Sequence, residues 1–259
     1  MRLQSVELQV EDLAKAAEFL EKTWGLTPAG TAGKAHLFRG TSDLPHILAL
    51  SQGAAALLGV TFCAPEVAAE KVVKGPEGQV YRFVPEKKTA PLAAHRDKPI
   101  QLSHVVLNCA DVDAAERFAN ETLGLRTTDR TAHMTFVRCN RTHHCIAYAR
   151  GGYSSLNHIA FEMQDLDGVM RGIGRMRDAG YECQWGPGRH GPGNNVFGYF
   201  VAPFGANIEY TSEVEVVGDD YRVGSPADWK WPPGRIDHWG LSPRNAAMGA
   251  AEKKFRWAA

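Results

Sequence analysis

Alternating apolar positions followed by a helical pattern recur along the chain. Residues 102–109 (LSHVVLNC) carry apolar side chains at alternate positions, which predicts a strand with one buried face. Residues 13–20 carry apolar side chains at helical spacing, which predicts an amphipathic helix. Asp12 and Asp111 stand where a helix begins, and a carboxylate there can accept a hydrogen bond from a free N–H of the first turn.

This pattern is an internal repeat. Residues 3–26 align without a gap with residues 102–125, a third copy opens at Leu156, and a faint fourth opens near Leu58. The positions identical in the first pair are Leu3, Val6, Leu8, Asp12, Ala16, Phe19, Thr23, Gly25 and Leu26. Short strand patterns with turn residues fill the rest of each unit. We therefore predict an α+β fold of four βαβββ modules paired into two domains, each a curved mixed sheet around a cavity.

Composition marks the boundaries of these domains. Residues 86–99 (EKKTAPLAAHRDKP) are polar and contain two prolines, so they are expected to form a linker. The N-terminal domain is predicted at residues 1–90 and the C-terminal domain at residues 100–217. The tail, residues 218–259, is rich in Gly, Pro and Trp, and we expect it to wrap over the second domain as a lid.

Two histidines occupy the same position of the repeat. His104 and His158 each lie two residues after the leucine that opens their unit, and the matching residue of the first domain is Ser5. A single histidine in a strand is more often a packed core residue. Two histidines at the same repeat position would not both remain after the repeats diverged unless both contributed to one site. We therefore predict that His104 and His158 share one metal ion, and that the N-terminal domain is non-catalytic.

The third ligand is expected to be a carboxylate. Two imidazoles and one carboxylate on one side of an ion suit a non-haem Fe(II) that keeps open positions for substrate and O₂. Glu209 lies between the strand formers Ile208 and Tyr210, where an unpaired carboxylate would be costly. Its rivals Glu213 and Glu215 have the pattern of a solvated strand face. Mn(II) is the alternative ion, because nitrogen and oxygen ligands suit both.

Charge and cysteine content narrow the class of protein. Lys+Arg and Asp+Glu both number 29, so there is no net field to hold a nucleic acid. No apolar run reaches the roughly 20 residues that span a bilayer, and acidic residues interrupt the N-terminus where a signal peptide would be apolar. The five cysteines form no C-x-x-C pair, which argues against a disulfide framework and favours a reduced cytoplasm.

A spaced motif lies in the last strands of the second domain. It consists of Gly188, Arg189, His190, Gly198, Tyr199, Ala202, Pro203, Gly205 and Glu209. This motif resembles the signature of type I extradiol ring-cleaving dioxygenases of the vicinal oxygen chelate superfamily. The likeness covers nearly the whole chain at the level of the four-unit plan. Gly198 and Ala202 depart from it, since the family usually has a bulky apolar residue at the first position and often Asp at the second.

The resemblance implies an activity and three further active-site residues. Proteins of this family open catechol-type rings with O₂ at one Fe(II), giving a semialdehyde acid, and act as homo-oligomers. His144 matches the histidine beside the O₂ position, which acts as acid and base. His190 and Tyr199 match the pair that hydrogen-bonds the substrate oxygens. His143 is expected to be an exposed residue that points to the other face of its strand.

The substrate contacts follow from the same resemblance. Residues 186–191 (GPGRHG) with Asn194 resemble the branch that acts on dihydroxyphenylacetate-like substrates, and Asn194 is a candidate binding residue. Trp185 stands where that branch has an arginine, and an indole is no bidentate partner for a carboxylate. We therefore expect a neutral or extra-hydroxylated single-ring catechol. Arg235 resembles an arginine of the family's C-terminal lid and is the candidate to meet an anion.

Two other functions stay open at this point. A glyoxalase-like isomerase or lyase using Zn or Ni would usually add a second carboxylate or a Gln ligand, and no acidic residue adjoins His104. A non-catalytic ligand-binding protein of the same fold would keep the ligand positions. It would have no need for His144, His190 and Tyr199 to converge around them.

Overall fold

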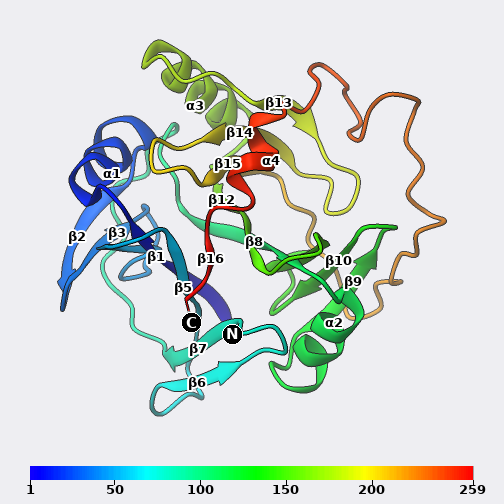
Figure 1. Cartoon of the computed structure of the whole chain (residues 1–259), viewed down its shortest axis with the longest axis horizontal. Helices are drawn as coiled ribbons and strands as arrows, with labels where there is room; N and C mark the ends of the chain where they lie inside the picture. The colour runs from blue at the N-terminus through cyan, green and yellow to red at the C-terminus, as the bar shows by residue number, and fades with distance from the viewer. Residues whose placement is uncertain (259) are drawn as a thin grey trace.

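The strands of both halves form one continuous mixed sheet in the computed structural model, which describes residues 1–258 (Figure 1). The first half contains β1 (Arg2–Val10), α1 (Leu13–Phe19), the π-helical turn η1 (Leu20–Trp24), β2 (Thr27–Ala32), β3 (Ala35–Arg39), β4 (Leu48–Gln52), β5 (Ala56–Ala64), β6 (Lys71–Lys74) and β7 (Val80–Pro85). The second half contains β8 (Gln101–Cys109), α2 (Val112–Glu121), β9 (Arg126–Arg130), β10 (Met134–Arg138), β11 (Ile146–Arg150), β12 (Ser155–Glu162), α3 (Leu166–Asp178), β13 (Trp185–Arg189), β14 (Val196–Val201) and β15 (Asn207–Ser212). The tail adds α4 (Ala247–Ala251) and β16 (Arg256–Trp257).

The predicted α+β fold is confirmed, with two departures in the second module, which lacks the helix and has two strands after its first instead of three. The modules that start at β1, β8 and β12 each consist of a strand, a helix and three strands. The module that starts at β5 passes to β6 without a helix. Only residues 65–70 connect these two strands, and six residues are too few for a helix of the length seen in the other modules.

The opening strands of paired modules lie side by side. β1 pairs antiparallel with β5, and β8 pairs antiparallel with β12. In each module the last strand returns parallel to the first, as β11 does beside β8 and β15 beside β12. Equivalent positions of two modules are thereby brought to the same part of one sheet. This is the arrangement that the repeat predicts for His104 and His158.

Aspartates cap the three longer helices at their first turns. Asp12 accepts a hydrogen bond from the Lys15 N–H at 2.9 Å, and Asp111 accepts one from the Ala114 N–H at the same distance. Asp165 does the same for α3, through the Gly168 N–H at 2.8 Å. Each carboxylate satisfies a donor that has no partner within its helix. The cap positions predicted at Asp12 and Asp111 are confirmed.

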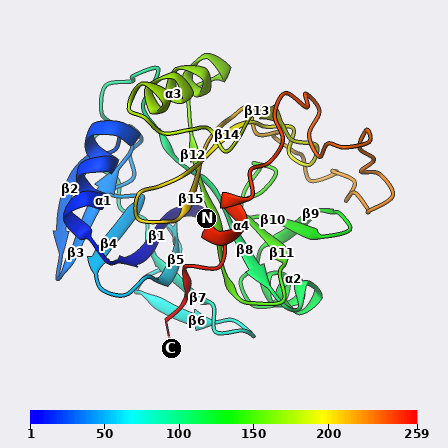
Figure 2. The same cartoon turned by 45° about the horizontal axis from the view of Figure 1, so that its top comes forward.

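Among the contacts that hold the two halves together are a strand pairing and an aromatic stack. β16, at the end of the tail, pairs with β5 of the first half and β12 of the second, and so continues the sheet between them. Figure 2 shows the red end of the chain running beside β5. Trp24, at the end of η1, stacks on Tyr210 of β15 with ring centroids 3.7 Å apart. The Tyr210 hydroxyl donates to the Trp24 carbonyl at 2.7 Å, and Arg175 of α3 donates to the same hydroxyl. Tyr210 is the residue next to Glu209, so the junction of the halves adjoins the predicted site.

The tail follows an irregular path before it joins the sheet. Residues 218–245 contain no named helix or strand, and their orange trace runs outside the β9–β10 side of the second half (Figure 1).

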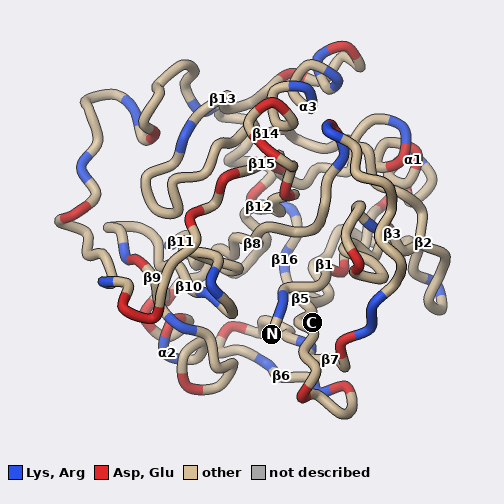
Figure 3. Tube along the Cα trace, turned by 180° about the vertical axis from the view of Figure 1, so that it is seen from behind, with Lys and Arg blue, Asp and Glu red and all other residues tan. Residues whose placement is uncertain are grey.

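Basic and acidic residues are interspersed over both halves of the molecule (Figure 3). No helix among residues 1–258 is long and apolar enough to cross a membrane.

Two glycines of α3 test how closely this helix packs on the sheet beside Glu209. A β-carbon at Gly172 would lie 2.7 Å from the Tyr210 ring, whereas one at Gly174 would meet nothing within 4 Å. We expect Gly172→Ala to lower the free energy of unfolding by about 1–3 kcal/mol through overpacking. Gly174→Ala should raise it by up to about 1 kcal/mol, because alanine is the better helix former. Urea denaturation checks both variants, and equal effects would show that α3 does not pack on Tyr210 in this way.

Candidate metal centre

One row of side chains crosses four neighbouring strands of the second half. In the register of the sheet, His104 of β8 lies opposite Ala160 of β12, and Ala160 lies opposite Glu209 of β15. Tyr199 of β14 is opposite Glu209 on its other side. Residues opposite each other in a sheet point to the same face, so the row places His104, Glu209 and Tyr199 together. His158 joins them because it lies two residues before Ala160 on the same strand.

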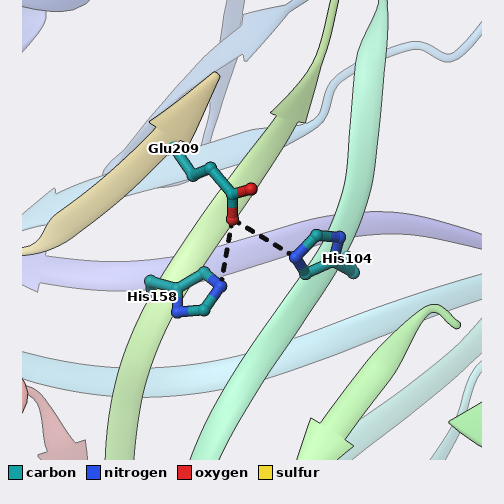
Figure 4. A group of neighbouring side chains, drawn as sticks. All are labelled: His104, His158 and Glu209. Carbon is teal, nitrogen blue, oxygen red and sulfur yellow. Dashed lines mark ion pairs between the residues drawn. The ribbon is translucent and has the colours of Figure 1, made fainter. Parts of the chain in front are cut away.

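The ligand atoms of three of these residues converge (Figure 4). His158 Nε2 lies 3.1 Å and His104 Nε2 lies 3.3 Å from the same oxygen, Oε2 of Glu209. One ligand atom from each residue falls within 4.8 Å of the others, and all three side chains are buried. Ala160 offers only a methyl group at the centre of the row, which leaves space between the three ligand atoms.

The remaining ring nitrogens of the two histidines are held by their sequence neighbours. His158 Nδ1 lies 2.8 Å from Asn157 Oδ1, and His104 Nδ1 lies 3.0 Å from Ser103 Oγ. The Asn157 amide donates in turn to Asn108 at 2.9 Å, which fixes its oxygen toward His158. His158 therefore donates from Nδ1 and presents the lone pair of Nε2 to the site. Such outer hydrogen bonds orient imidazoles for metal binding.

The electrostatics of the cluster fit a bound cation. Burial alone would raise the pKa of the Glu209 carboxyl, but positive charge beside it, on His104 and His158 when they are protonated, lowers this pKa well below its usual range. Burial lowers the pKa of His158, which favours its neutral form. Glu209 Oε2 is buried and has no hydrogen-bond partner among the described residues. A carboxylate oxygen and an imidazole lone pair that face each other at 3.1 Å repel unless a cation lies between them.

His144 packs against the ring of His104. The two ring centroids are 4.2 Å apart, and His144 lines the same cavity as His104 and His158. Burial lowers the pKa of His144 well below its ordinary value, and repulsion from neighbouring imidazoles when they are protonated adds to this, so the ring is neutral near pH 7. A β-carbon at Gly193 would lie only 2.9 Å from His144 Cε1, so the glycine lets the backbone approach the ring.

The expectation for His143 is wrong. This residue has no exposed surface, and its Nδ1 lies 3.0 Å from His144 Nδ1. Residues 139–145 connect β10 and β11 outside any strand, so the alternation of faces on which the expectation rested does not apply to them. The buried carboxylate of Asp129 satisfies the other nitrogen of His143, at 2.7 Å from Nε2.

His190 and Tyr199 form a pair at the edge of the cluster. His190 Nε2 lies 2.9 Å from the Tyr199 hydroxyl, which is 3.5 Å from His158 Nε2. Burial lowers the pKa of His190 to about 4, so the ring is neutral near pH 7. Burial and the charge of Glu209 raise the pKa of Tyr199 well above its ordinary value, which keeps the phenol protonated. The pair thus offers polar groups without net charge.

A cavity of about 580 Å³ opens onto the cluster. Its polar lining includes His104, His144, His158, His190 and Tyr199. The apolar lining comes from the sheet and from the tail, and it includes Val106, Met134, Phe136, Trp185, Trp229, Trp231, Ile236 and Met248. The side chains around Glu209 can therefore bind a ligand with one polar end and a bulky apolar part.

The three residues expected to contact substrate lie in different places. Trp185 lines the cavity and stacks on Tyr199 with ring centroids 5.2 Å apart. Asn194 and Arg235 are exposed and are not among the residues that line it, so a substrate contact of either stays a prediction. Asn194 is in a left-handed turn, with φ 49°, and Arg235 donates to the Trp239 carbonyl at 3.2 Å.

Asn195 takes the inward position that was expected of Asn194. It is buried, lines the cavity, and its amide nitrogen lies 3.4 Å from Glu209 Oε1. The sequence alone did not show which of the two asparagines points inward. The left-handed backbone of Asn194 decides this, and the pattern of apolar residues does not predict it. The sequence signal that could have pointed to Asn195 is its place directly before the apolar stretch of residues 196–201 (VFGYFV).

Comparisons with known proteins agree with this geometry. Residues 101–210 match the family described as "Glyoxalase/Bleomycin resistance protein/Dioxygenase superfamily". The chain is 33% identical over 139 residues to metapyrocatechase 2 of Cupriavidus necator, covering 52% of this chain and 41% of that protein. It is 26% identical over 141 residues to 2,2',3-trihydroxybiphenyl dioxygenase of Sphingomonas paucimobilis, covering 49% and 48%. The chain thus spans less than half the length of these curated relatives.

Solved structures cover nearly the whole chain. The Mn(II)-bound glyoxalase from Novosphingobium aromaticivorans superposes with a TM-score of 0.84 at 28% identity, over 95% of this chain and 92% of that one. Homoprotocatechuate 2,3-dioxygenase from Brevibacterium fuscum, in complex with 3,4-dihydroxyphenylacetate, gives 0.81 at 22% identity, over 96% and 91%, and shows the likeness of fold alone. The matched domain at residues 101–210 and the likeness of fold throughout make the chain similar to proteins of the glyoxalase/bleomycin resistance/dioxygenase superfamily.

Proposed function

We propose that the protein is an extradiol dioxygenase that opens a catechol-type ring with O₂ at one divalent metal ion held by His104, His158 and Glu209. The observation that carries the proposal is the cluster of these three residues beside a cavity that His104 and His158 line together with His144, His190 and Tyr199. Three ligands leave positions on the ion for two reactants, and three neutral acid–base groups surround those positions. The names of the curated relatives support the same chemistry.

The residues around the ion have separate tasks in this proposal. When bound, the ion lowers the pKa of a coordinated diol and positions it beside O₂. Tyr199 and His190 hydrogen-bond the diol oxygens, and Trp185, stacked on Tyr199, forms a flat wall beside the ring. His144 takes up and returns a proton at its cavity-facing nitrogen. Because its pKa is lowered, the ring is unprotonated near neutral pH and has a lone pair with which to accept a proton.

Fe(II) is the ion that we propose, with Mn(II) as its alternative. Two imidazoles and a carboxylate are the donor set of non-haem Fe(II) oxygenases, and hard nitrogen and oxygen ligands also suit Mn(II). The Mn(II)-bound glyoxalase of similar fold favours the second ion and also a second function, glyoxalase-type chemistry without O₂. Against that function, the metal-binding group found among residues 1–258 has three members and no second carboxylate. Consumption of O₂ separates the two.

The cavity also bears on the size of the substrate. Its volume of about 580 Å³ lies in the range that holds drug-sized ligands, and one ring would leave much of it to water against apolar walls. We therefore replace the expected single-ring substrate by a catechol that carries a bulky apolar substituent. We further propose that the protein acts in the cytoplasm, in keeping with its five free cysteines, and as a homo-oligomer.

The ligand assignment predicts the effect of Glu209→Gln. The amide keeps the size but loses the charge, so metal affinity should fall by more than the roughly 10–100-fold that outer partners of a metal site contribute. Metal content after gel filtration, measured by mass spectrometry, checks this. Glu213→Gln is the matched control, because Glu213 is exposed and pairs with Arg189. Full metal content in the Glu209 variant would assign the carboxylate ligand elsewhere.

The role of His144 predicts a separation of binding from turnover. His144→Phe removes the acid–base group while it keeps a ring against His104 and Phe136. We expect metal content and anaerobic diol affinity to stay near the wild-type values, and kcat to fall by roughly 10²–10⁴-fold. Anaerobic titration and oxygen-electrode rates measure the two quantities. A loss of diol affinity with kcat retained would give His144 a binding role instead.

The proposed reaction is tested with Fe(II)-loaded protein and a panel of diols. Catechol, 3-methylcatechol and a 3-aryl catechol are compared by O₂ uptake and by absorbance of the product. We expect one O₂ per diol, a yellow ring-opened product, and a kcat/KM for the aryl compound at least about tenfold above that for catechol, because its second ring is buried on binding. Metal-loaded protein that consumes no O₂ with any diol would favour the glyoxalase-type function.

A further inference from the structure

A chain of hydrogen bonds leads away from the candidate site behind His144. His144 Nδ1 lies 3.0 Å from His143 Nδ1, and His143 Nε2 lies 2.7 Å from Asp129 Oδ2. His143 and Asp129 have no exposed surface, and neither lines the cavity that His144 lines. Phe136 packs edge-on against both imidazoles, with centroids 5.2 and 5.8 Å away. The three polar residues thus form a closed path from the cavity into the interior.

The tail holds the far end of this path. Asp129 Oδ1 accepts from the Gly224 N–H at 2.7 Å, and Oδ2 accepts from the Tyr221 hydroxyl at 3.2 Å. The Arg130 N–H donates to the Gly224 carbonyl at 2.9 Å, which ties the tail to the end of β9. A β-carbon at Gly224 would lie 2.3 Å from Asp129 Oδ1, so only glycine permits this approach. The carboxylate therefore has three donors in fixed positions.

These contacts determine where the protons of both rings lie. The carboxylate can only accept, so the proton of a neutral His143 is on Nε2 and its Nδ1 carries a lone pair. Two nitrogens 3.0 Å apart need one proton between them, and His144 must supply it from its own Nδ1. His144 Nδ1 faces His143, so Nε2 is the ring nitrogen left for the cavity.

We propose that His143 and Asp129 are positioning residues that hold His144 as the Nδ1–H tautomer, with an unprotonated Nε2 directed into the cavity, and that Tyr221 and Gly224 of the tail fix Asp129 in this task. The inference rests on the proposed function for its consequence: His144 enters the reaction as a proton acceptor and acts as a donor only afterwards. The tautomer itself does not depend on any turnover.

The tautomer is measured directly by NMR. Protein labelled with ¹⁵N is loaded with Zn(II), which is diamagnetic, and two-bond ¹H–¹⁵N correlations show which nitrogen of each histidine carries a proton. His144→Phe identifies the His144 signals by their loss. We expect a protonated Nδ1 and a bare Nε2 for His144 in the wild-type protein. A protonated Nε2, or two rings with no hydrogen bond between them, would overturn the proposal.

Asp129→Asn should reverse the direction of the hydrogen bonds that run from residue 129 through His143 to His144. Gly224 N–H can only donate, so the amide oxygen stays with it and the amide N–H₂ turns toward His143. His143 must then accept at Nε2 and donate from Nδ1, which moves the proton of His144 to Nε2. Asp219→Asn makes the same chemical change at an exposed carboxylate of the tail that pairs with Arg126, and it should leave the tautomer unchanged.

Kinetics of the Fe(II)-loaded variants complete the test. In Asp129→Asn we expect kcat to fall by roughly 10²-fold or more with KM for the diol nearly constant, because the acceptor nitrogen is blocked while the diol contacts remain. An unchanged kcat in a variant whose tautomer has inverted would refute the positioning role. Wild-type protein that shows the expected tautomer but cleaves no diol would refute the proposed function and leave the assignment of the protons intact.

Discussion

Glu209 is a fully buried carboxylate. The arrangement of the second half of the chain depends on how the charge of this carboxylate is compensated. Moving a carboxylate out of water costs several kcal/mol even after the protein relaxes. The contacts of Glu209 do not offset this cost, because its Oε2 has no hydrogen-bond donor and faces the lone pair of His158. A cation bound between the three ligand atoms would neutralise the carboxylate charge and would accept both the Oε2 and the His158 lone pairs. Metal binding and the stability of the second half are therefore linked, since an ion that binds only the folded state adds to its stability.

The same constraint explains why the site lies at the junction of two modules. Strands β8 and β12 bring equivalent positions of the repeat into one sheet, and β15 adds the carboxylate in register with Ala160. A larger side chain at residue 160 would fill the space between the ligands. In the first half the position that matches His104 is Ser5, which is buried on β1. A duplicated fold can thus keep a metal centre in one pair of modules while the other pair serves packing.

The sequence was sufficient for the features that depend on periodicity. The repeat placed His104 and His158 on paired strands, and the aspartate before each helical pattern predicted its cap. The features that the sequence did not predict depend on the backbone path of segments outside helices and strands. His143 breaks the alternation because residues 139–145 are not a strand, and the tail's pairing as β16 involves only two residues. The missing helix after β5 was hidden because residues 65–70 are compatible with a helix but too few for one.

The tail shows why such segments matter for the chemistry. Its tryptophans Trp229 and Trp231 line the cavity, and a β-carbon at Gly191 would lie 2.2 Å from the Trp231 ring. Gly224 meets Asp129 as closely, so the tail is packed against the site at two places where only glycine leaves room. One segment thereby forms the apolar wall for a substituent and fixes the carboxylate behind His144. Because the same chain end then pairs with β5 and β12, part of the cavity wall, the end of the hydrogen-bonded path and one joint between the halves all depend on the tail.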